Sequence, residues 1–223
     1  MNDIRLVVFD MAGTTVRDTG QVADSFVSAL REHGCEISDE ELTAVRGASK
    51  REAVARLIPE GPDSEQKAAR VYETFRKNLE DRYRLDAVAP VEGAEKVFRW
   101  LRSLGVLVAL NTGFDRDITG LLISALGWGT GIVDAVVCGD DVEEGRPAPF
   151  LIFEAMKATR IGNADQVANV GDTVRDLEAG HRAGVRWNIG VLSGAHDRSR
   201  LSAAPHTHIL PSIADLPSLW DRP

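Results

Sequence analysis

Cysteine is scarce in this sequence, with only Cys35 and Cys138 in 223 residues. They lie far apart along the chain and match no metal-binding spacing, which argues against a cysteine metal centre. A disulfide between them is possible, but a chain of this length can bury a core without one. The length suits one sizeable α/β domain, or a core of about 150 residues with a smaller insert.

Positive charge is also in short supply. Lys and Arg number 26 against 34 Asp and Glu, which leaves a formal net charge of −8. This balance disfavours binding to nucleic acid or to an anionic membrane, but a local pocket can still take a small anionic substrate. No apolar run reaches the ~20 residues that span a bilayer, and the start "MNDIRLVVFD" lacks a signal-peptide pattern. We therefore expect a cytoplasmic protein with no nucleic-acid or membrane partner.

The first part of the chain predicts a buried strand followed by helices. The run "IRLVVFD" is continuous and β-branched, as in a parallel strand that is buried on both faces. After it the apolar spacing becomes helical, and residues 18–88 have an all-helical pattern. Ser38 and Glu41 have the spacing of a capping box at a helix start. Ser49 and Glu52 repeat that spacing at the next helix.

Strands and helices alternate over the rest of the chain. The strand-like runs "VLVALNTG", "AVVCGDD", "QVANVGDT" and "VRWNIGVLSG" are separated by helical ones, and "THILPSIADLPSLW" adds a last short strand and helix. Repeated βα units predict a doubly wound, Rossmann-like parallel sheet with helices on both faces. We expect an α/β core from residues 1–17 and 89–223, with residues 18–88 inserted as an all-helical cap.

Several expected strands end in polar groups. The first ends at Asp10, the second runs into "NTG" (111–113), and a later one ends at Asp172, one helical turn before Asp176. In an open parallel sheet, ligands bind beyond the carboxyl ends of the strands. Carboxylates and a backbone carbonyl suit Mg²⁺, and Arg146 in "EGRPAP" can neutralise phosphoryl charge. Each group alone is common loop chemistry, but their order along the chain is specific.

These groups, in this order, resemble the motifs of the haloacid dehalogenase superfamily of phosphohydrolases over essentially the whole chain. The matching segments are "DMAGT" (10–14), Thr112 in "LNTG", Arg146 in "GRPAP" and "GDTVRD" (171–176). The resemblance implies that Asp10 is the nucleophile that forms an aspartyl-phosphate. It also implies that Asp10, Asp172 and the backbone carbonyl of Ala12 hold Mg²⁺. Asp176 would support this metal site without being a ligand.

The same resemblance assigns the phosphoryl group to Thr112 and Arg146. The backbone N–H groups of Gly113, like those of Gly13 and Thr14, would hold its oxygens. The metal and the arginine lower the repulsion between the attacking carboxylate and the substrate anion, which is the main barrier to attack. The expected partner is therefore a small phosphorylated or phosphonate metabolite.

Position 12 departs from the common pattern, because most members carry a second aspartate there and this chain has Ala12. That aspartate serves as acid and base, and its loss costs about 10²- to 10⁴-fold when the reaction needs one. Ala12, together with Arg146 where others have Lys, resembles the phosphonoacetaldehyde hydrolase (phosphonatase) branch. In that branch a cap lysine forms an imine with the substrate aldehyde. The C–P bond then breaks into an enamine, and no leaving oxygen needs a proton.

Lys50 is the candidate for that lysine. It follows Gly47 by three residues in "RGASKREAV", the spacing of the branch, and it lies just inside a helix start. The positive end of the helix dipole disfavours an ammonium there, which helps the amine attack a carbonyl. Two neighbours differ, because the branch has histidine at the position of Ala53 and methionine at the position of Arg46. The alternatives are a surface lysine, or one that binds the far end of a phosphate ester.

Three functions stay open on this basis. The first is a Mg²⁺-dependent hydrolase of the phosphonatase type. The second is a phosphomonoesterase of the same fold that acts on a small metabolite, as phosphoglycolate phosphatases do. The third is a phosphoacceptor or binding module without turnover. The helical cap argues against the third, since a lid that excludes water serves chemistry on small molecules. An apolar face of the cap could support a homodimer.

Histidine and tryptophan carry no predicted site. His206 and His208 could share one face of a short strand and bind a metal, but a surface pair is the favoured interpretation. The four tryptophans are spread along the sequence and indicate packing rather than a platform for stacking nucleic-acid bases.

Overall fold

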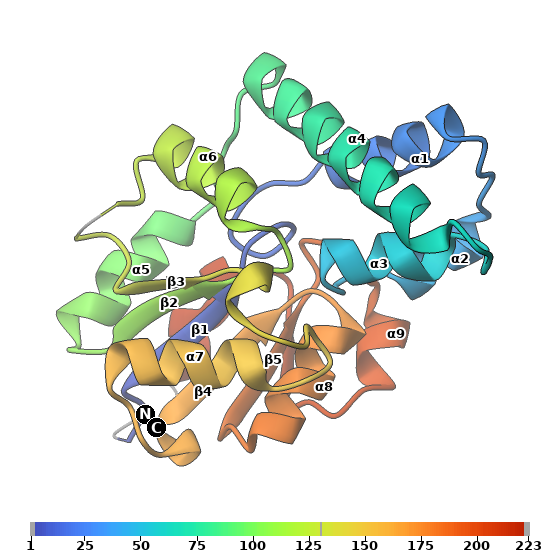
Figure 1. Ribbon diagram of the computed structural model, residues 1–223. Coiled ribbons are helices and arrows are strands. Elements are labelled where there is room, and N and C mark those ends of the chain that lie inside the picture. Colours follow the sequence, from blue (N-terminus) through green and yellow to red (C-terminus); the bar gives the residue numbers. More distant parts are fainter. Residues whose placement is uncertain (1–2, 130, 221–223) are drawn as a thin grey trace.

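The sheet of this protein is fully parallel. A computed structural model describes residues 3–129 and 131–220. In it, six strands form one sheet in the order β3-β2-β1-β4-β5-β6 (Figure 1). The strands are β1 (Leu6–Asp10), β2 (Leu107–Asn111), β3 (Ala135–Val137), β4 (Val167–Gly171), β5 (Trp187–Val191) and β6 (His208–Leu210). The order moves outward from β1 in both directions, which confirms the predicted doubly wound, Rossmann-like class.

Helices cover both faces of the sheet. They are α5 (Ala94–Ser103), α6 (Arg116–Leu126), α7 (Phe150–Thr159), α8 (Val174–Ala183), α9 (Arg198–Ser202) and α10 (Leu216–Trp220), with short 3₁₀ turns at η1 (Gly139–Asp141), η2 (Ala164–Gln166) and η3 (Ile213–Asp215). Alternate residues of β1 point to opposite faces, because side chains along a strand repeat every two residues. Leu6 and Val8 join a buried cluster with α7, whereas Val7 and Phe9 join the larger cluster that includes α5.

Four further helices lie together on the side of the carboxyl ends of the strands (Figure 1). They are α1 (Gln21–Glu32), α2 (Asp39–Ala44), α3 (Lys50–Leu57) and α4 (Ser64–Leu85). The rings of Phe26 on α1 and Phe75 on α4 stack with their centres 4.2 Å apart. All four helices fall within residues 18–88, the segment that we propose as the cap.

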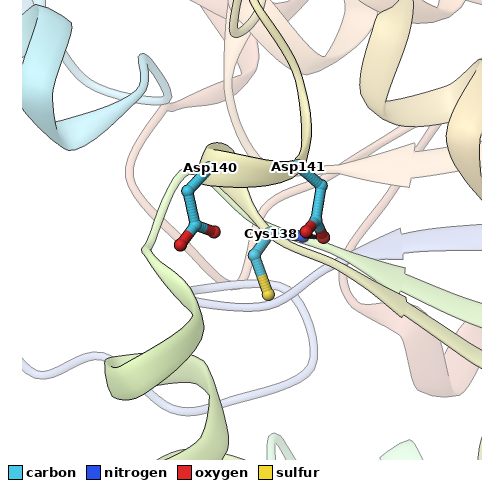
Figure 2. A group of neighbouring side chains, drawn as sticks. All are labelled: Cys138, Asp140 and Asp141. Atoms are coloured by element: carbon cyan, nitrogen blue, oxygen red, sulfur yellow. Dashed lines mark hydrogen bonds between the residues drawn. The ribbon is translucent and has the colours of Figure 1, made fainter.

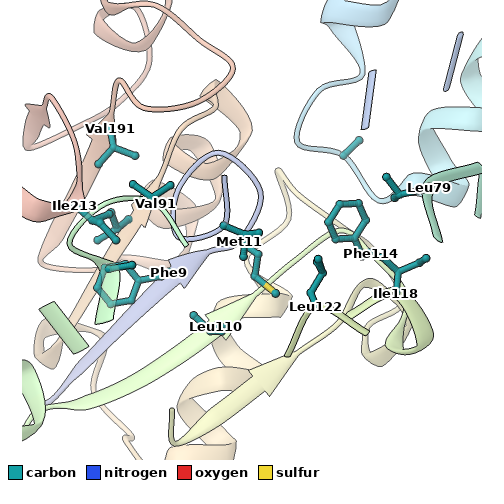
Figure 3. Close-up of a cluster of buried hydrophobic side chains, with 14 of the residues drawn as sticks. Phe9, Met11, Leu79, Val91, Leu110, Phe114, Ile118, Leu122, Val191 and Ile213 are labelled. Atoms are coloured by element: carbon teal, nitrogen blue, oxygen red, sulfur yellow. The ribbon is translucent and has the colours of Figure 1, made fainter. Parts of the chain in front are cut away.

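One hydrophobic cluster runs from the sheet into these helices (Figure 3). Phe9 and Leu110 contribute from β1 and β2, Phe114 from the loop after β2, and Leu79 from α4. Burial of apolar area is the main favourable term in folding. The shared cluster therefore holds the four helices against the carboxyl edge of the sheet.

One of the two predicted capping boxes is wrong. Ser38 and Glu41 exchange both reciprocal hydrogen bonds at the start of α2. Ser49 is the N-cap residue of α3, but its side chain makes no capping hydrogen bond. It packs against Gly145, where a Cβ would lie 2.9 Å from the Cβ of Ser49. Glu52 instead pairs with Arg56 at 2.6 Å, so contact with the core replaces the local cap.

Two features are absent from the described residues, a disulfide bond and a helix that could cross a membrane. Cys35 and Cys138 are both buried and free, so no disulfide links them. Within the described residues, no helix combines the length and the apolar character that crossing a membrane requires.

The aromatic rings of the outer strands and helices pack together. His208 lies in β6 with its ring stacked on Trp187 at 4.8 Å, whereas His206 precedes that strand, so the two histidines do not share a strand face. Trp220 stacks on Trp100 at 5.5 Å and meets Trp187 edge-on at 6.0 Å. The packing interpretation of the tryptophans is therefore confirmed, although three of them gather in one place.

Candidate active site

Asp10 ends β1 and lies opposite Asn111 of β2 in the sheet register. Every residue of β1 is buried, and the Asp10 side chain is held at the carboxyl edge because the chain turns sharply after it. The turn needs Gly13, whose φ is +90° and whose Cβ would lie 2.6 Å from Oδ2 of Asp172. Thr15 closes the turn from behind by donating its hydroxyl to the Asp10 carbonyl at 2.9 Å.

Arg146 bridges three elements through two aspartates and one asparagine. One guanidinium nitrogen, Nη1, lies 2.5 Å from Asp10 and 2.7 Å from Asp176. The other, Nη2, donates to the side-chain oxygen of Asn111 at 2.6 Å and to its carbonyl at 3.1 Å. Arg146 is buried, so these charge-assisted bonds form at low local dielectric.

Asp172 follows β4 and lies close to Asp10 and Asp176. Its carboxylate accepts a hydrogen bond from the Thr14 hydroxyl at 3.0 Å and another from the backbone N–H of Ala195 at 2.6 Å. Burial, and then the charges of Asp10 and Asp176, raise the pKa of Asp172 well above its ordinary value. Burial also raises the pKa of Asp10 to about 6, against the opposing effect of Arg146.

Asp176 lies in the first turn of α8. It accepts hydrogen bonds from the backbone N–H of Thr173 at 2.9 Å and from the Thr173 hydroxyl at 2.5 Å, and thereby caps the helix. Its other oxygen pairs with Arg146. Two buried carboxylates thus pair with one guanidinium while the buried Asp172 does not, and a hard divalent cation fits this excess of negative oxygen.

The predicted cradle of N–H groups at Gly13 and Thr14 is wrong. The N–H of Gly13 donates to the carbonyl of Val16 at 2.8 Å, and that of Thr14 donates to Met11 at 3.2 Å. Both donors are thus used inside the turn. Thr112 keeps a donor, because its oxygen accepts from the N–H of Phe114 at 3.1 Å while its own O–H proton has no acceptor among the described residues.

Lys50 is the first residue of α3, as predicted. Its backbone N–H donates to the carbonyl of Gly113 at 3.1 Å, and a Cβ on Gly113 would lie 2.5 Å from the carbonyl of Ala48. The ammonium lies 5.1 Å above the ring of Phe114 and 3.5 Å from the Ala48 carbonyl. Burial lowers the pKa of Lys50, and the carboxylate of Asp10 opposes that effect.

A cavity of about 180 Å³ brings these residues together. Of the predicted site residues, it is lined by Asp10, Ala12, Gly13, Lys50, Thr112, Gly113, Arg146 and Asp172. Thr14 and Asp176 do not line it and act through Asp172 and Arg146. Sequence reasoning missed the loop after β5, where Ser193 donates to the Gly13 carbonyl at 2.8 Å and Gly194 leaves space for Asp172. The strand-end rule could have found it, since β5 ends at the same edge.

A second acidic group lies nearby in the turn after β3, where Cys138, Asp140 and Asp141 gather (Figure 2). Asp141 is already paired with Arg116 and accepts the N–H of Cys138 at 2.8 Å. Asp140 accepts the N–H of Arg116 at 3.2 Å. Burial raises the pKa of the Cys138 thiol and so disfavours a thiolate ligand. These contacts give the acidic side chains a structural role in the turn after β3.

A parallel α/β sheet with a buried acidic site at the carboxyl ends of its strands is a common arrangement for binding small ligands. Comparison with known proteins names the family. The model of the haloacid dehalogenase-like hydrolases matches residues 7–189, and the chain belongs to that family.

Two curated relatives are phosphonoacetaldehyde hydrolases. The one from Bacillus cytotoxicus is 30% identical over 215 residues, and the one from Bacillus cereus strain AH187 is 29% identical over 208. Each alignment covers 87% of this chain and 78% of the relative.

Solved structures share the fold. A hydrolase from Pseudomonas syringae has a TM-score of 0.86 at 21% identity, covering 97% of this chain and 98% of its own. A phosphonoacetaldehyde hydrolase-like protein from Oleispira antarctica has a TM-score of 0.85 at 21% identity, covering 97% and 91%. A predicted phosphoglycolate phosphatase from Haemophilus somnus has a TM-score of 0.77 at 19% identity, covering 99% of this chain and 100% of its own.

Proposed function

We propose that the chain is a Mg²⁺-dependent hydrolase that cleaves the C–P bond of a small carbonyl phosphonate through an aspartyl-phosphate on Asp10. The observation that carries this proposal is one cavity that holds Lys50, Asp10 and Ala12 together. It offers an amine, a carboxylate nucleophile and no acid at position 12. A leaving carbon suits such a site better than a leaving oxygen does, because an enamine needs no proton as it departs.

Asp10, Asp172 and the carbonyl of Ala12 would hold Mg²⁺. The bound ion supplies charge that offsets the repulsion between the carboxylates and the phosphoryl oxygens. Arg146 adds a fixed positive charge beside the attacking oxygen of Asp10, and the Thr112 hydroxyl is free to donate to a phosphoryl oxygen.

Lys50 carries the carbon half of the reaction. Its neutral amine adds to the substrate carbonyl, and loss of water leaves a protonated imine. As an oxygen of Asp10 bonds to phosphorus, the C–P electron pair moves into an enamine. Protonation of the enamine carbon and hydrolysis of the imine release the carbonyl product, and water hydrolyses the aspartyl-phosphate. The burial that lowers the pKa of Lys50 supports this role, because only the unprotonated amine attacks.

Borohydride trapping tests the assignment of Lys50. We expect borohydride, added with phosphonoacetaldehyde and Mg²⁺, to reduce the imine to a stable adduct that mass spectrometry locates on Lys50. Lys50→Arg keeps the charge but loses the amine, and should lose both adduct and turnover. Lys157, which is exposed on α7, gives the matched control Lys157→Arg with full activity. Turnover of the aldehyde without an adduct, or an active Lys50→Arg variant, would contradict the imine.

The second candidate is a phosphomonoesterase in which Lys50 binds the far end of a phosphate ester. The ammonium of Lys50 over the Phe114 ring supports it, since this arrangement holds a cation without requiring chemistry. A panel of phosphate esters assayed for phosphate release separates the two. If the chain is a phosphomonoesterase, Lys50→Arg should keep most of the activity, and Ala12→Asp should raise the rate of ester hydrolysis. The covered cavity disfavours a phosphoacceptor without turnover.

A further inference from the structure

Part of the cap side of the active-site cavity is an apolar wall. Val22, Ala23 and Phe26 line it from one face of α1, and Leu42 and Val45 line it from α2 and its end. Positions 22, 23 and 26 are neighbours on a helix surface, so the three side chains make a continuous wall. All five belong to the large hydrophobic cluster or pack against it, which fixes the wall in place.

Three charged side chains of the cap also line this cavity: Asp18, Arg46 and Lys50, the last of which lies 5.1 Å above the ring of Phe114. The carboxylate of Asp18 accepts the N–H of Gly20 at 3.0 Å, and Arg46 donates to the Ala195 carbonyl at 3.3 Å. Among the described cap residues that line the cavity, no side chain is a hydroxyl or an amide. A hydroxyl group buried against the five apolar side chains themselves would find no hydrogen-bond partner on them, at a cost of ~1–3 kcal/mol for each such group.

The size of the cavity sets the length of the group that fits. Its ~180 Å³ compares with the ~150 Å³ of apolar cavities that take up benzene. A phosphoryl group beside Asp10 and Arg146 occupies the polar end. The remaining space toward α1 and α2 suits a short hydrocarbon chain.

We propose that Val22, Ala23, Phe26, Leu42 and Val45 form an aliphatic subsite, and that the substrate carries a short hydrocarbon chain at the end away from phosphorus. The proposal rests on the proposed function, which puts the phosphoryl group at Asp10. Under C–P cleavage the substrates are 2-oxoalkylphosphonates with more carbons than phosphonoacetaldehyde. Sugar phosphates, whose hydroxyls would meet the apolar wall, are poor ligands.

Binding of n-alkylphosphonates, which cannot be turned over by either route, tests the subsite separately from catalysis. We expect calorimetry with Mg²⁺ present to show Kd falling about three- to fourfold for each added carbon from methyl- to butylphosphonate, which corresponds to ~0.8 kcal/mol per methylene. The hydroxylated analogue 2,3-dihydroxypropylphosphonate should bind at least tenfold more weakly than propylphosphonate.

Two variants locate the effect. Ala23→Phe fills the subsite, so butylphosphonate should bind no tighter than methylphosphonate. Val45→Thr adds a hydroxyl to the wall and should reduce the gain per carbon, and its melting temperature shows whether the variant stays folded. The control Asp24→Phe places the same ring at the next, exposed position of α1 and should leave the chain-length series unchanged.

The outcomes separate this proposal from the previous one. A flat series, no binding at all, or tighter binding of the hydroxylated analogue overturns the aliphatic subsite, even if phosphonoacetaldehyde is hydrolysed. A steep series that Ala23→Phe abolishes supports the subsite, even in a chain that releases phosphate from no carbonyl phosphonate. That last result would overturn C–P cleavage alone.

Discussion

Arg146 is the side chain on which the buried acidic cluster depends. It pairs with Asp10 and Asp176 at 2.5 and 2.7 Å, and all three are buried. Removal of one partner from a buried ion pair typically costs ~3–5 kcal/mol, because the other charge stays buried and uncompensated. The two aspartates would then repel each other with no cation between them.

Arg146→Ala should therefore lower the free energy of unfolding by ~3–5 kcal/mol, measured by urea denaturation at neutral pH without metal. Arg186→Ala is the matched control, because Arg186 pairs with Asp3 at 3.1 Å at an exposed position. We expect that control to cost less than ~1 kcal/mol. Equal costs for the two variants would mean that the buried pairs contribute no more than an exposed one.

Lys50 gives the site a pH dependence whose sign follows from burial. Burial lowers the pKa of Lys50 below the ordinary lysine value of 10.5, while Asp10, Asp18 and Asp172 oppose this and Arg146 adds to it. The amine attacks only when it is unprotonated, so imine formation should rise with pH through the lowered pKa. Trapping with borohydride across pH 6–10 should show a midpoint below that of free lysine. Trapping that still rises about tenfold per pH unit at pH 10, with no midpoint inside the range, would contradict a lowered pKa at Lys50.

At the scale of elements, the loop from α2 to α3 can pack closely against the core because residue 47 is a glycine. Gly47 has a φ of +79°, and a Cβ there would lie 2.5 Å from the hydroxyl of Thr173. Arg175 reaches across the same junction and donates to the carbonyl of Ala44 at 3.1 Å. Lys50 follows three residues after Gly47, so its position depends on this close approach.

Gly47→Ala should cost both stability and activity. The positive φ alone costs ~1 kcal/mol, and the clash with Thr173 moves the start of α3 away from the core. Gly34→Ala is the control, because Gly34 has a φ of +69° but no neighbour within 4 Å of its Cβ. We expect a larger loss of melting temperature for Gly47→Ala than for Gly34→Ala, and a fall in kcat/KM of at least tenfold only for Gly47→Ala. Equal activities would show that the loop does not position Lys50.

Helices and strands were predictable from the sequence where the spacing of apolar residues alone decides the element. Contacts between two elements were less predictable. The β-branched run before Asp10 and the helical spacing of α1 are local signals, and the structure has both elements. The capping box at Ser49 failed because its side chain packs against Gly145, nearly a hundred residues away. The prediction that the N–H groups of Gly13 and Thr14 hold phosphoryl oxygens failed because both groups donate hydrogen bonds inside the turn. Neither event leaves a pattern in the local sequence.

At the scale of the whole molecule, the chain carries a formal net charge of −8 and folds three carboxylates into one buried site. The strand-end rule predicted that these groups would meet, since it depends only on topology. It did not predict the loop after β5, whose backbone donates to Asp172. A bound cation would offset the excess charge that this topology concentrates, so metal and fold stability should be coupled.

We therefore expect Mg²⁺ to raise the melting temperature of the chain, and EDTA to reverse the rise and abolish turnover. A ligand that binds only the folded state stabilises it by about 2.7 kcal/mol at a hundredfold excess over its Kd. Asp172→Ala should lose the Mg²⁺-dependent shift, because too few anionic oxygens remain for a hard cation. Asp141→Ala, in the acidic group beside Cys138, is the matched control and should keep the full shift. If Asp141→Ala loses the shift and Asp172→Ala keeps it, the cation binds in the turn after β3, and Asp10 has no metal beside it.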